Sequence, residues 1–430
     1  MASIREVLRG NVLILTLGTV IRQLSLFITF PYFSLYIRAL GGSNVVVGQV
    51  NALRPLAAMF LYPIAGSLAD NYGRVKIIVT MNYLSAALHT LFMLAPDWRF
   101  LAAASLLNGL TIFMFPATSA LLADSLPPQL RGRGFATITA IPGFVGILSP
   151  FIGGYLITVY GVTHAMRLLY GVTAAATVLI GTMNLKFLKE TLTRPGDTHL
   201  SLDQVIRGSY RSVWETLRWM PKGLKFYAIM LVLGLFFNSL TGSYWVVYGT
   251  DVIGLSELEW GGILLLANII QVSLSLPAGA LIDRYDKRMT LALALALSAL
   301  PVFAFPFSGG FLGALLVFTP IAVANAFLIP AASALMADMV PRERRGTVMA
   351  TLGRGMIFVN YRGGGGGGPA MGFFLTFPAV LGFLIGGYVY DTGPFYPWML
   401  LGVVLAVNTL ISVLFIKPSE KQVKYGYKSI

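Results

Sequence analysis

The residues of this chain best suited to chemistry are two arginines inside long apolar runs. Arg22 lies well inside the run Val12–Ile37, and Arg54 lies well inside Val45–Ala69. A guanidinium group binds carboxylate or phosphate oxygens through charge-assisted hydrogen bonds. An arginine at the middle of a bilayer costs at least about 2.5–3.5 kcal/mol, so it should face a cavity or a partner. These two residues therefore suggest the binding of a small anion.

The acidic residues support this interpretation by their positions. All 17 Asp and Glu residues lie between apolar runs or near the ends of them. We therefore favour an exogenous anion as the counter-charge of the arginines. The case is stronger for Arg22 than for Arg54, because Arg54 directly precedes Pro55. The alternative stays open that each arginine fixes helix packing by bonding to backbone carbonyls or to the amides Gln23, Asn51 and Asn108.

Aromatic and amide side chains in other apolar runs complete the candidate binding surface. A mid-span amide serves equally well to join two helices or to contact a solute, and both roles stay open. The residues of this group are Tyr32, Phe237, Asn238, Tyr244, Gln271 and Asn325.

Composition indicates the solvent in which these residues act. The chain is 56% hydrophobic and only 11% charged, whereas a soluble protein carries roughly a quarter of its residues as charges. Lipid is therefore the natural solvent. There is no cysteine, and the three histidines have no ligand spacing, so we expect neither a metal nor a cofactor. The net charge of +14 lies in short runs between apolar segments, which argues against nucleic acid as a partner.

The apolar segments predict an all-α membrane protein with twelve spans. Each is long enough to cross a hydrocarbon core of about 30 Å, and none has the short alternating pattern of a barrel strand. The predicted spans are Val12–Ile37, Val45–Ala69, Val75–Leu94, Phe100–Ala123, Phe135–Val159, Met166–Leu185, Phe226–Gly249, Trp260–Ile282, Met289–Phe307, Phe311–Ala337, Pro369–Tyr390 and Trp398–Ile416.

Lysine and arginine predict the orientation of these spans. They gather in alternate loops, in the stretch 186–225 and in the tail 417–430. Because cytoplasmic loops carry an excess of these residues, both termini should be cytoplasmic in a multi-pass protein of the cytoplasmic membrane.

The chain repeats itself with a shift of about 213 residues. Phe115–Pro127 matches Ile329–Pro341, and Gly66–Tyr72 matches Gly279–Tyr285. Such matches indicate a duplicated six-helix unit. An even number of spans per unit makes the two copies parallel, which suits two bundles that rock about a central site.

This repeat sets the expected domains. We expect six-helix bundles at residues 1–186 and 226–416, a cytoplasmic linker at 187–225 and a cytoplasmic tail at 417–430. The second copy carries about 19 additional residues near 353–371, including the glycine run 363–368. Because glycine is a poor helix former, we expect this insertion in a cytoplasmic loop.

One motif resembles a known family. Gly66-Ser-Leu-Ala-Asp70-Asn-Tyr-Gly73-Arg74-Val-Lys76 is similar to the signature loop of the major facilitator superfamily. A degenerate copy lies at Gly279–Arg288, and the resemblance extends over the whole chain. It implies a secondary transporter with two six-helix bundles.

The motif and its repeat also predict a charged gating latch. Gly66 allows close approach of the helix ends, Gly73 permits a tight turn, and Arg74 can pair with Asp124. Ion pairs at a moving interface bias two-state equilibria. The alternative is that these charges only mark cytoplasmic loops. The other residues assigned to this latch are Asp70, Arg131, Asp283, Asp338 and Arg345.

The fifth span resembles a motif of proton-driven antiporters. It reads Gly143-x-x-Gly146-x-x-Ser149-Pro150-x-x-Gly153-Gly154, with a serine where a glycine is usual. Close helix packing explains the same pattern equally well. The arginine expected near Ser105 in such antiporters is missing.

We therefore predict a secondary transporter of a small organic solute, anionic in character. The alternative is a proton-driven multidrug efflux antiporter for lipophilic compounds. No nucleophile and base are grouped as in an enzyme. Expected partners are the solute, the bilayer and a coupling proton or ion, and we expect a monomer. A protonated solute, exchange of two anions and facilitated diffusion all stay open as energy sources.

Overall fold

The computed structural model describes residues 7–192, 202–363 and 372–416. Across these ranges the chain is helical and contains no strand. Twelve of the described helical stretches are long and apolar enough to cross a membrane, which confirms the predicted fold class. They are Gly10–Ala39, Asn44–Tyr62, Arg74–Leu94, Trp98–Asp124, Gly134–Tyr160, Val162–Phe187, Lys222–Asp251, Glu257–Arg284, Lys287–Phe307, Gly310–Met339, Phe373–Thr392 and Tyr396–Phe415.

Contacts divide the chain into two compact units. The first unit comprises Met1–Gly42 and Leu56–Ser209, and the second comprises Ser43–Pro55 and Tyr210–Ile430. The boundary falls inside helix α4 (Asn44–Tyr72), so the first turns of this helix group with the second unit.

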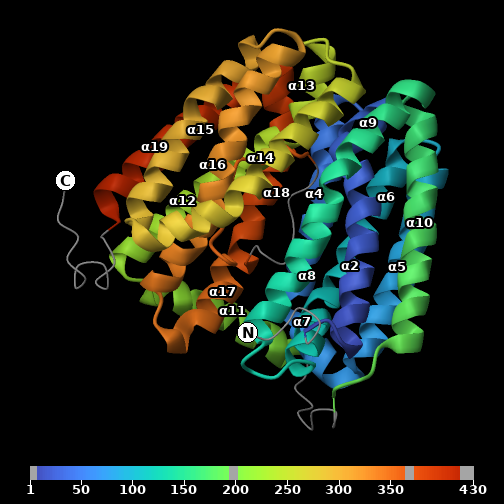
Figure 1. The fold of residues 1–430 in the computed structure, drawn as a ribbon, viewed down its shortest axis with the longest axis vertical. Helices are drawn as coiled ribbons and strands as arrows, with labels where there is room; N and C mark the ends of the chain where they lie inside the picture. The colour runs from blue at the N-terminus through green and yellow to red at the C-terminus, as the bar shows by residue number, and fades with distance from the viewer. Residues whose placement is uncertain (1–6, 193–201, 364–371, 417–430) are drawn as a thin grey trace. The chain divides into compact units, whose positions relative to one another are not determined.

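Several spans of the first unit are broken by short 3₁₀ turns (Figure 1). Pro31 lacks the backbone N–H that would continue helix α2, and the 3₁₀ turn after Asn108 begins at Gly109. The elements in chain order are α2 (Gly10–Thr29), α3 (Phe33–Ala39), α5 (Arg74–Leu94), α6 (Trp98–Asn108), α7 (Met114–Asp124), α8 (Arg131–Val145), α9 (Ser149–Tyr160) and α10 (Val162–Phe187).

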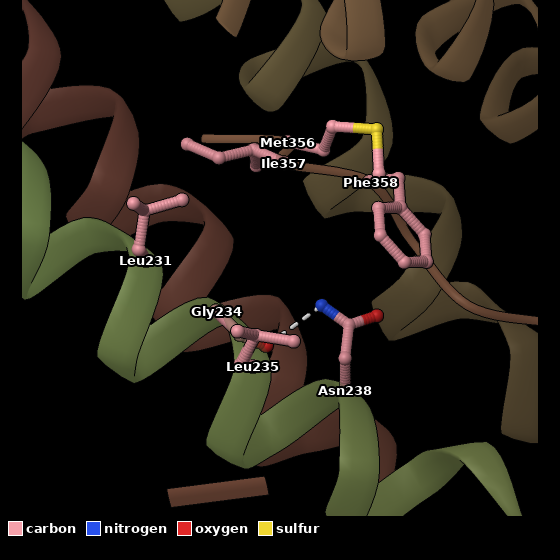
Figure 2. Close-up of a pocket in the computed structure, with 7 residues that line it drawn as sticks. All are labelled: Leu231, Gly234, Leu235, Asn238, Met356, Ile357 and Phe358. Atoms are coloured by element: carbon pink, nitrogen blue, oxygen red, sulfur yellow. Dashed lines mark hydrogen bonds between the residues drawn. The ribbon is translucent and has the colours of Figure 1, made fainter. Parts of the chain in front are cut away.

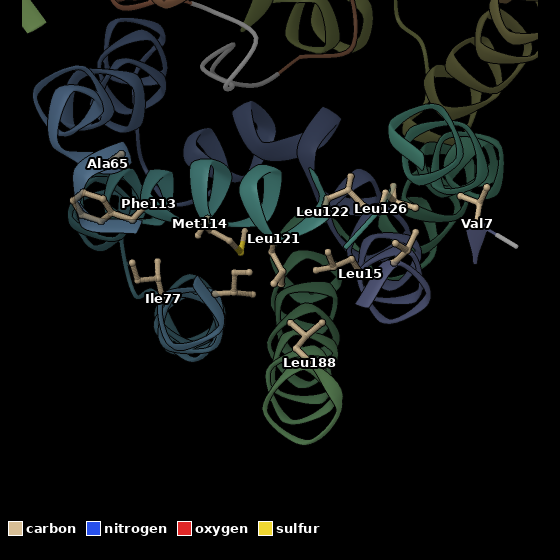
Figure 3. Close-up of a cluster of buried hydrophobic side chains, with 13 residues drawn as sticks. Val7, Leu15, Ala65, Ile77, Phe113, Met114, Leu121, Leu122, Leu126 and Leu188 are labelled. Atoms are coloured by element: carbon tan, nitrogen blue, oxygen red, sulfur yellow. The ribbon is translucent and has the colours of Figure 1, made fainter. Parts of the chain in front are cut away.

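A core of buried apolar side chains holds one end of the first unit together. Figure 3 shows Leu15 from α2, Ile77 from α5 and Leu121 from α7 among the side chains of this cluster. Leu121 is fully buried. Since lipid tails are as apolar as these side chains, close packing, rather than exclusion of water, is what favours the association of these helices.

The second unit repeats this plan with longer helices. Its core is aromatic: Trp245, Phe305, Phe318 and Trp398 contact one another at ring-centroid distances of 4.6–5.6 Å. The elements are α11 (Leu202–Trp219), α12 (Lys222–Gly242), α13 (Trp245–Asp251), α14 (Glu257–Arg284), α15 (Lys287–Ala304), α16 (Gly310–Met339), α17 (Arg345–Leu352), α18 (Phe373–Thr392) and α19 (Tyr396–Phe415).

The two units share individual contacts as well as helix order. The hydroxyl of Tyr36 donates to the carbonyl of Phe92, and that of Tyr248 donates to the carbonyl of Pro306. The carbonyls, like the tyrosines, are separated by the shift of the repeat. A repeat visible in single hydrogen bonds agrees with duplication of one folded unit.

The second unit departs from the plan at its eleventh span. Helix α17 ends at Leu352, helix α18 begins at Phe373, and residues 353–363 between them are not helical. The expected position of this insertion is a cytoplasmic loop. Its described part instead runs beside α12, α14 and α16, because polar side chains of these helices bond to it. Residues 364–371, with most of the glycine run, lie outside the described residues.

Candidate solute-binding site

Arg22 is held inside the first unit by two neutral groups. Its Nη2 donates to Oδ1 of Asn82 on α5 at 3.0 Å, and its Nη1 donates to Sδ of Met114 on α7 at 3.2 Å. Asn82 is buried, and its Nδ2 donates to the carbonyl of Ile78 in its own helix. That bond turns Oδ1 toward the guanidinium. These two contacts fix the position of the Arg22 guanidinium.

Asn82 was not among the residues expected at this site. The amides proposed as packing partners of Arg22 were Gln23, Asn51 and Asn108. Gln23 lies on the same predicted span as Arg22, and the other two lie on the second and fourth predicted spans. A signal existed nonetheless, since Asn82 is a buried amide within the apolar run of α5.

The remaining candidates of the first unit make local contacts. Gln23 packs against Gly146, where an added Cβ would lie 2.7 Å from its Cγ. Tyr32 is fully buried and donates its hydroxyl to the carbonyl of Pro150 at 2.6 Å. Asn108 accepts from the hydroxyl of Thr111 at 3.2 Å. Gln23 and Tyr32 thus contact the fifth span of their own unit.

Two candidates lie in the part of α4 that groups with the second unit. Asn51 is buried, and its Nδ2 donates to the carbonyl of Val47 at 2.9 Å. Its Oδ1 accepts no hydrogen bond from the described residues. Arg54 is partly buried.

Three mid-span amides of the second unit meet in one place. Asn238 of α12, Gln271 of α14 and Asn325 of α16 all bond to the non-helical residues between α17 and α18. Figure 2 shows Asn238 beside Met356, Ile357 and Phe358 of this segment. The cavity between them has a volume of about 10 Å³, room for no more than one water. The three amides were predicted as candidate binding residues from the sequence, but the non-helical segment to which they bond was not.

The two aromatic candidates of the second unit differ in their surroundings. Phe237 is partly buried and meets Phe236 edge-on at a ring-centroid distance of 4.9 Å. Tyr244 is fully buried, stacks on Tyr390 at 4.8 Å and donates its hydroxyl to the carbonyl of Asn44 at 2.9 Å. Tyr244 therefore joins the start of α4 to the rest of the second unit.

A larger cavity of about 350 Å³ lies beside α17. Its size falls in the range of small-molecule sites. The lining is mostly apolar, with two arginines, and comprises Ser333, Met336, Ala337, Val340, Arg345, Met349, Arg354 and Met356.

Three of the predicted latch residues, Arg74, Asp124 and Asp338, take part in ion pairs at equivalent positions of the two units. Arg74 pairs with Asp124 in the first unit and also donates to Oγ1 of Thr191 at 3.0 Å. In the second unit Nζ of Lys287 lies 2.5 Å from Oδ2 of Asp338. Lys287 occupies the repeat position of Arg74, a correspondence the motif alone did not reveal.

Other latch residues cap helix ends. Nε of Arg131 donates to the carbonyl of Ala123, and Nη2 of Arg345 donates to the carbonyl of Ala337, both at 2.9 Å. Gly73 has φ +90, so only glycine fits without strain. Asp283 is exposed. Gly66 and Asp70 lie in α4. The surroundings of both residues fall outside the described part of the structure.

Comparison with known proteins identifies the family. Residues 15–365 match the Major Facilitator Superfamily. The chain is similar to the multidrug resistance protein MdtH of Escherichia coli (strain SE11), with 24% identity over 89% of this chain and 88% of that protein. The fold resembles the nucleoside transporter NupG (TM-score 0.68, 12% identity, 95% of this chain and 100% of that one). It also resembles the human organic anion transporter MFSD10 (TM-score 0.62, 15% identity, 96% and 100%).

The twelve apolar helices within the described residues, the parallel repeat and a family match over most of the sequence agree with one another. The chain belongs to the Major Facilitator Superfamily and is a multi-pass membrane transporter.

Proposed function

We propose that this transporter moves a small organic anion across the membrane by alternating access. The observation that carries the proposal is Arg22, a partly buried guanidinium in the middle of the first span that bonds to Asn82 and Met114. An ionisable residue at this depth is functional by default, because its burial is costly. An anionic group of the solute repays that cost when it binds.

The repeat supports the transport mechanism. Parallel repeats place a site near the middle of the bilayer, and rocking of the repeats exposes it to each side in turn. Arg22 lies in the first span at a depth that suits such a site. The Arg74–Asp124 and Lys287–Asp338 pairs are our candidates for the latch that biases this rocking.

Multidrug efflux is the second candidate, and the similarity to MdtH over most of both chains favours it. The glycine motif of the fifth span adds less support, because packing accounts for it. Gly146 makes room for Gln23, and Gly153 lies against the carbonyl of Ile28. A pump for lipophilic cations would also be expected to carry an acid deep in a span, and the acids of this sequence lie near span ends or between spans.

A thermal-shift screen of the purified protein in detergent separates the two candidates. Probes are succinate, citrate, benzoate and glycerol phosphate as anions, glucose as a neutral solute, and tetraphenylphosphonium and ethidium as lipophilic cations. We expect an anion to raise the melting temperature of the wild type but not of Arg22→Gln. Stabilisation by the lipophilic cations alone, equal in both proteins, would exclude the anion proposal and support efflux.

A further inference from the structure

The eleventh span is preceded by backbone that is not helical. Residues 353–363 follow the short helix α17 and precede α18 in the chain. Irregular backbone inside a membrane is tolerated only where it is buried in protein or lines a polar cavity. In transporters, unwound stretches of this kind often form the binding site. The side chains that residues 353–363 expose therefore decide whether this segment can bind a solute.

The segment reaches the middle of the spans. It bonds to Asn238, Gln271 and Asn325, which lie near the centres of the spans Lys222–Asp251, Glu257–Arg284 and Gly310–Met339. Residues 359–362 of the segment thus lie at the middle of these helices.

Four hydrogen-bonding groups fix the backbone of the segment. Asn325 forms two bonds with Val359, donating to its carbonyl at 3.0 Å and accepting from its N–H at 2.9 Å. Oδ1 of Asn238 accepts from the N–H of Asn360 at 2.7 Å. The hydroxyl of Tyr227 lies 2.6 Å from the carbonyl of Gly355. These bonds satisfy backbone groups that a helix would otherwise satisfy internally, so the segment is a built part of the second unit.

The two faces of the segment differ in burial. Gly355, Ile357, Val359 and Tyr361 are buried against the helices. The alternate residues are partly exposed, as the period of two in extended backbone requires. They are Met356, Phe358, Asn360 and Arg362. We call these four the open face.

Arg362 is the charged residue at the mid-span end of the open face. Its Nη2 donates to Oε1 of Gln271 at 2.6 Å. The hydroxyl of Tyr361 lies 3.4 Å from the same oxygen, and the guanidinium lies 5.9 Å from the Tyr361 ring. Across the described residues no carboxylate pairs with Arg362. Gln271 therefore orients the guanidinium of Arg362 through a neutral group.

We propose that the open face is a solute-binding surface of the second unit, with Arg362 as its anion-binding cation and Gln271 as the residue that positions it. The ligand class is a small solute with a carboxylate or phosphate group, whose apolar part contacts Phe358. As a claim about the transported solute, this rests on the proposed function. The accessibility and charge of the open face are testable without it.

The absence of cysteine makes this surface accessible to a direct test. In the wild-type background, Phe358→Cys and Asn360→Cys place a single thiol on the open face, and Val359→Cys places one on the buried face. Purified full-length variants react with anionic sulfonatoethyl methanethiosulfonate or with its cationic trimethylammonium analogue. We expect the two open-face thiols to react at least about tenfold faster than the buried one, in line with the difference in exposure. Equal rates at all three positions would overturn the assigned faces.

Charge selectivity then tests Arg362 itself. A unit charge about 7 Å away, two residues along extended backbone, attracts the anionic reagent and repels the cationic one. We expect Arg362→Gln to lower the ratio of anionic to cationic rates at Asn360→Cys by about threefold or more. Arg342→Gln removes the same charge from an exposed position of the second unit and should leave the ratio unchanged. An unchanged ratio in Arg362→Gln would refute the proposal.

Gln271 and the solute complete the design. Gln271→Leu keeps the charge of Arg362 but removes its acceptor, so the ratio should fall less than in Arg362→Gln. An anion that stabilises the wild type should slow labelling of Asn360→Cys, and this protection should be lost in Arg362→Gln. If no anion stabilises the wild type while the charge effect persists, the proposed function fails and the cationic surface stands. If an anion binds but gives no protection, the solute site lies elsewhere.

Discussion

At the scale of single residues, amide side chains organise both candidate binding arginines. Asn82 uses its nitrogen to bond to its own helix and offers its oxygen to Arg22. Gln271 offers its oxygen to Arg362. An amide oxygen orients a guanidinium without cancelling its charge, whereas a carboxylate would hold the same geometry and remove the charge from use. The choice of amide is therefore consistent with a site that must bind an anion.

Two variants of Asn82 should therefore differ in anion affinity and in stability. Asn82→Asp should pair with Arg22 and lower anion affinity by at least tenfold, because the carboxylate competes with the solute. Asn82→Leu should lower affinity less, yet cost about 1–3 kcal/mol of stability, because a donor of Arg22 loses its buried acceptor.

Thermal unfolding and anion titration of the two proteins measure both quantities. A loss of affinity that follows the loss of stability, greatest in Asn82→Leu, would mean that Asn82 serves packing alone.

The ion pairs of the latch lead to a second prediction. Side-chain exposure is 12% for Arg74 and 42% for Asp124, and 18% and 23% for Lys287 and Asp338. Partly exposed pairs contribute about 0–1 kcal/mol. Asp124→Asn and Asp338→Asn should therefore barely change the melting temperature.

Transport of the stabilising anion by proteoliposomes should change in both variants, because each removes a contact that biases the conformational equilibrium. Unaltered transport in both proteins would assign these pairs to loop structure only.

The candidate site could be predicted from the sequence only in part. A mid-span arginine or amide is conspicuous in an apolar run, so the sequence draws attention to Arg22, Asn238, Gln271 and Asn325. It does not indicate their partners, because helices that are apolar on every side give little indication of which face meets which neighbour. Tyr32 was predicted to contact the solute, but its hydroxyl donates to the carbonyl of Pro150. The sequence does not distinguish a tyrosine that contacts a solute from one that bonds to a backbone carbonyl.

At the scale of elements, length and hydropathy predict the spans well because a bilayer fixes both. The non-helical segment before the eleventh span was harder to predict. Residues 353–371 appeared as an insertion with a glycine run, which by propensity belongs in a loop. A different pattern was present nearby: Ile357, Val359 and Tyr361 alternate with Phe358, Asn360 and Arg362. This alternation predicts extended backbone with one buried face, and in the structure buried and partly exposed side chains do alternate along these residues.

Close helix packing around glycine gives a third prediction. A Cβ at Gly153 would overlap the carbonyl oxygen of Ile28, and a Cβ at Gly386 would lie 2.6 Å from that of Leu240. Gly153→Ala and Gly386→Ala should each lose about 1–3 kcal/mol, because overpacking shifts the helices.

Gly143 supplies the matched control, since nothing lies within 4 Å of a Cβ at that position. Gly143→Ala should leave stability unchanged or raise it by up to about 1 kcal/mol through helix propensity. Thermal unfolding in detergent ranks the three variants. Equal effects at all three glycines would contradict the packing argument.

At the scale of the whole molecule, duplication is visible from motif to hydrogen bond. The pairs Tyr36 with Phe92 and Tyr248 with Pro306 occupy equivalent positions, and so do the ion pairs of Asp124 and Asp338. The binding chemistry has not stayed symmetric. Arg22 lies in a helix of the first unit, whereas Arg362 lies in an insertion that the first unit lacks. The two copies therefore share a scaffold and differ in the groups available to a solute.

The distribution of Lys and Arg predicts how this scaffold lies in the membrane, with both termini cytoplasmic. Gln129 and Val252 are exposed residues in loops that should lie on opposite sides. Because the chain has no cysteine, Gln129→Cys and Val252→Cys each carry one thiol. In intact cells a membrane-impermeant maleimide should label Val252→Cys and reach Gln129→Cys only after permeabilisation. The reverse labelling pattern would mean that the protein has the opposite orientation in the membrane. The loop containing Arg131 would then face outward, and the proposed latch would close the outer side of the transporter instead of the cytoplasmic one.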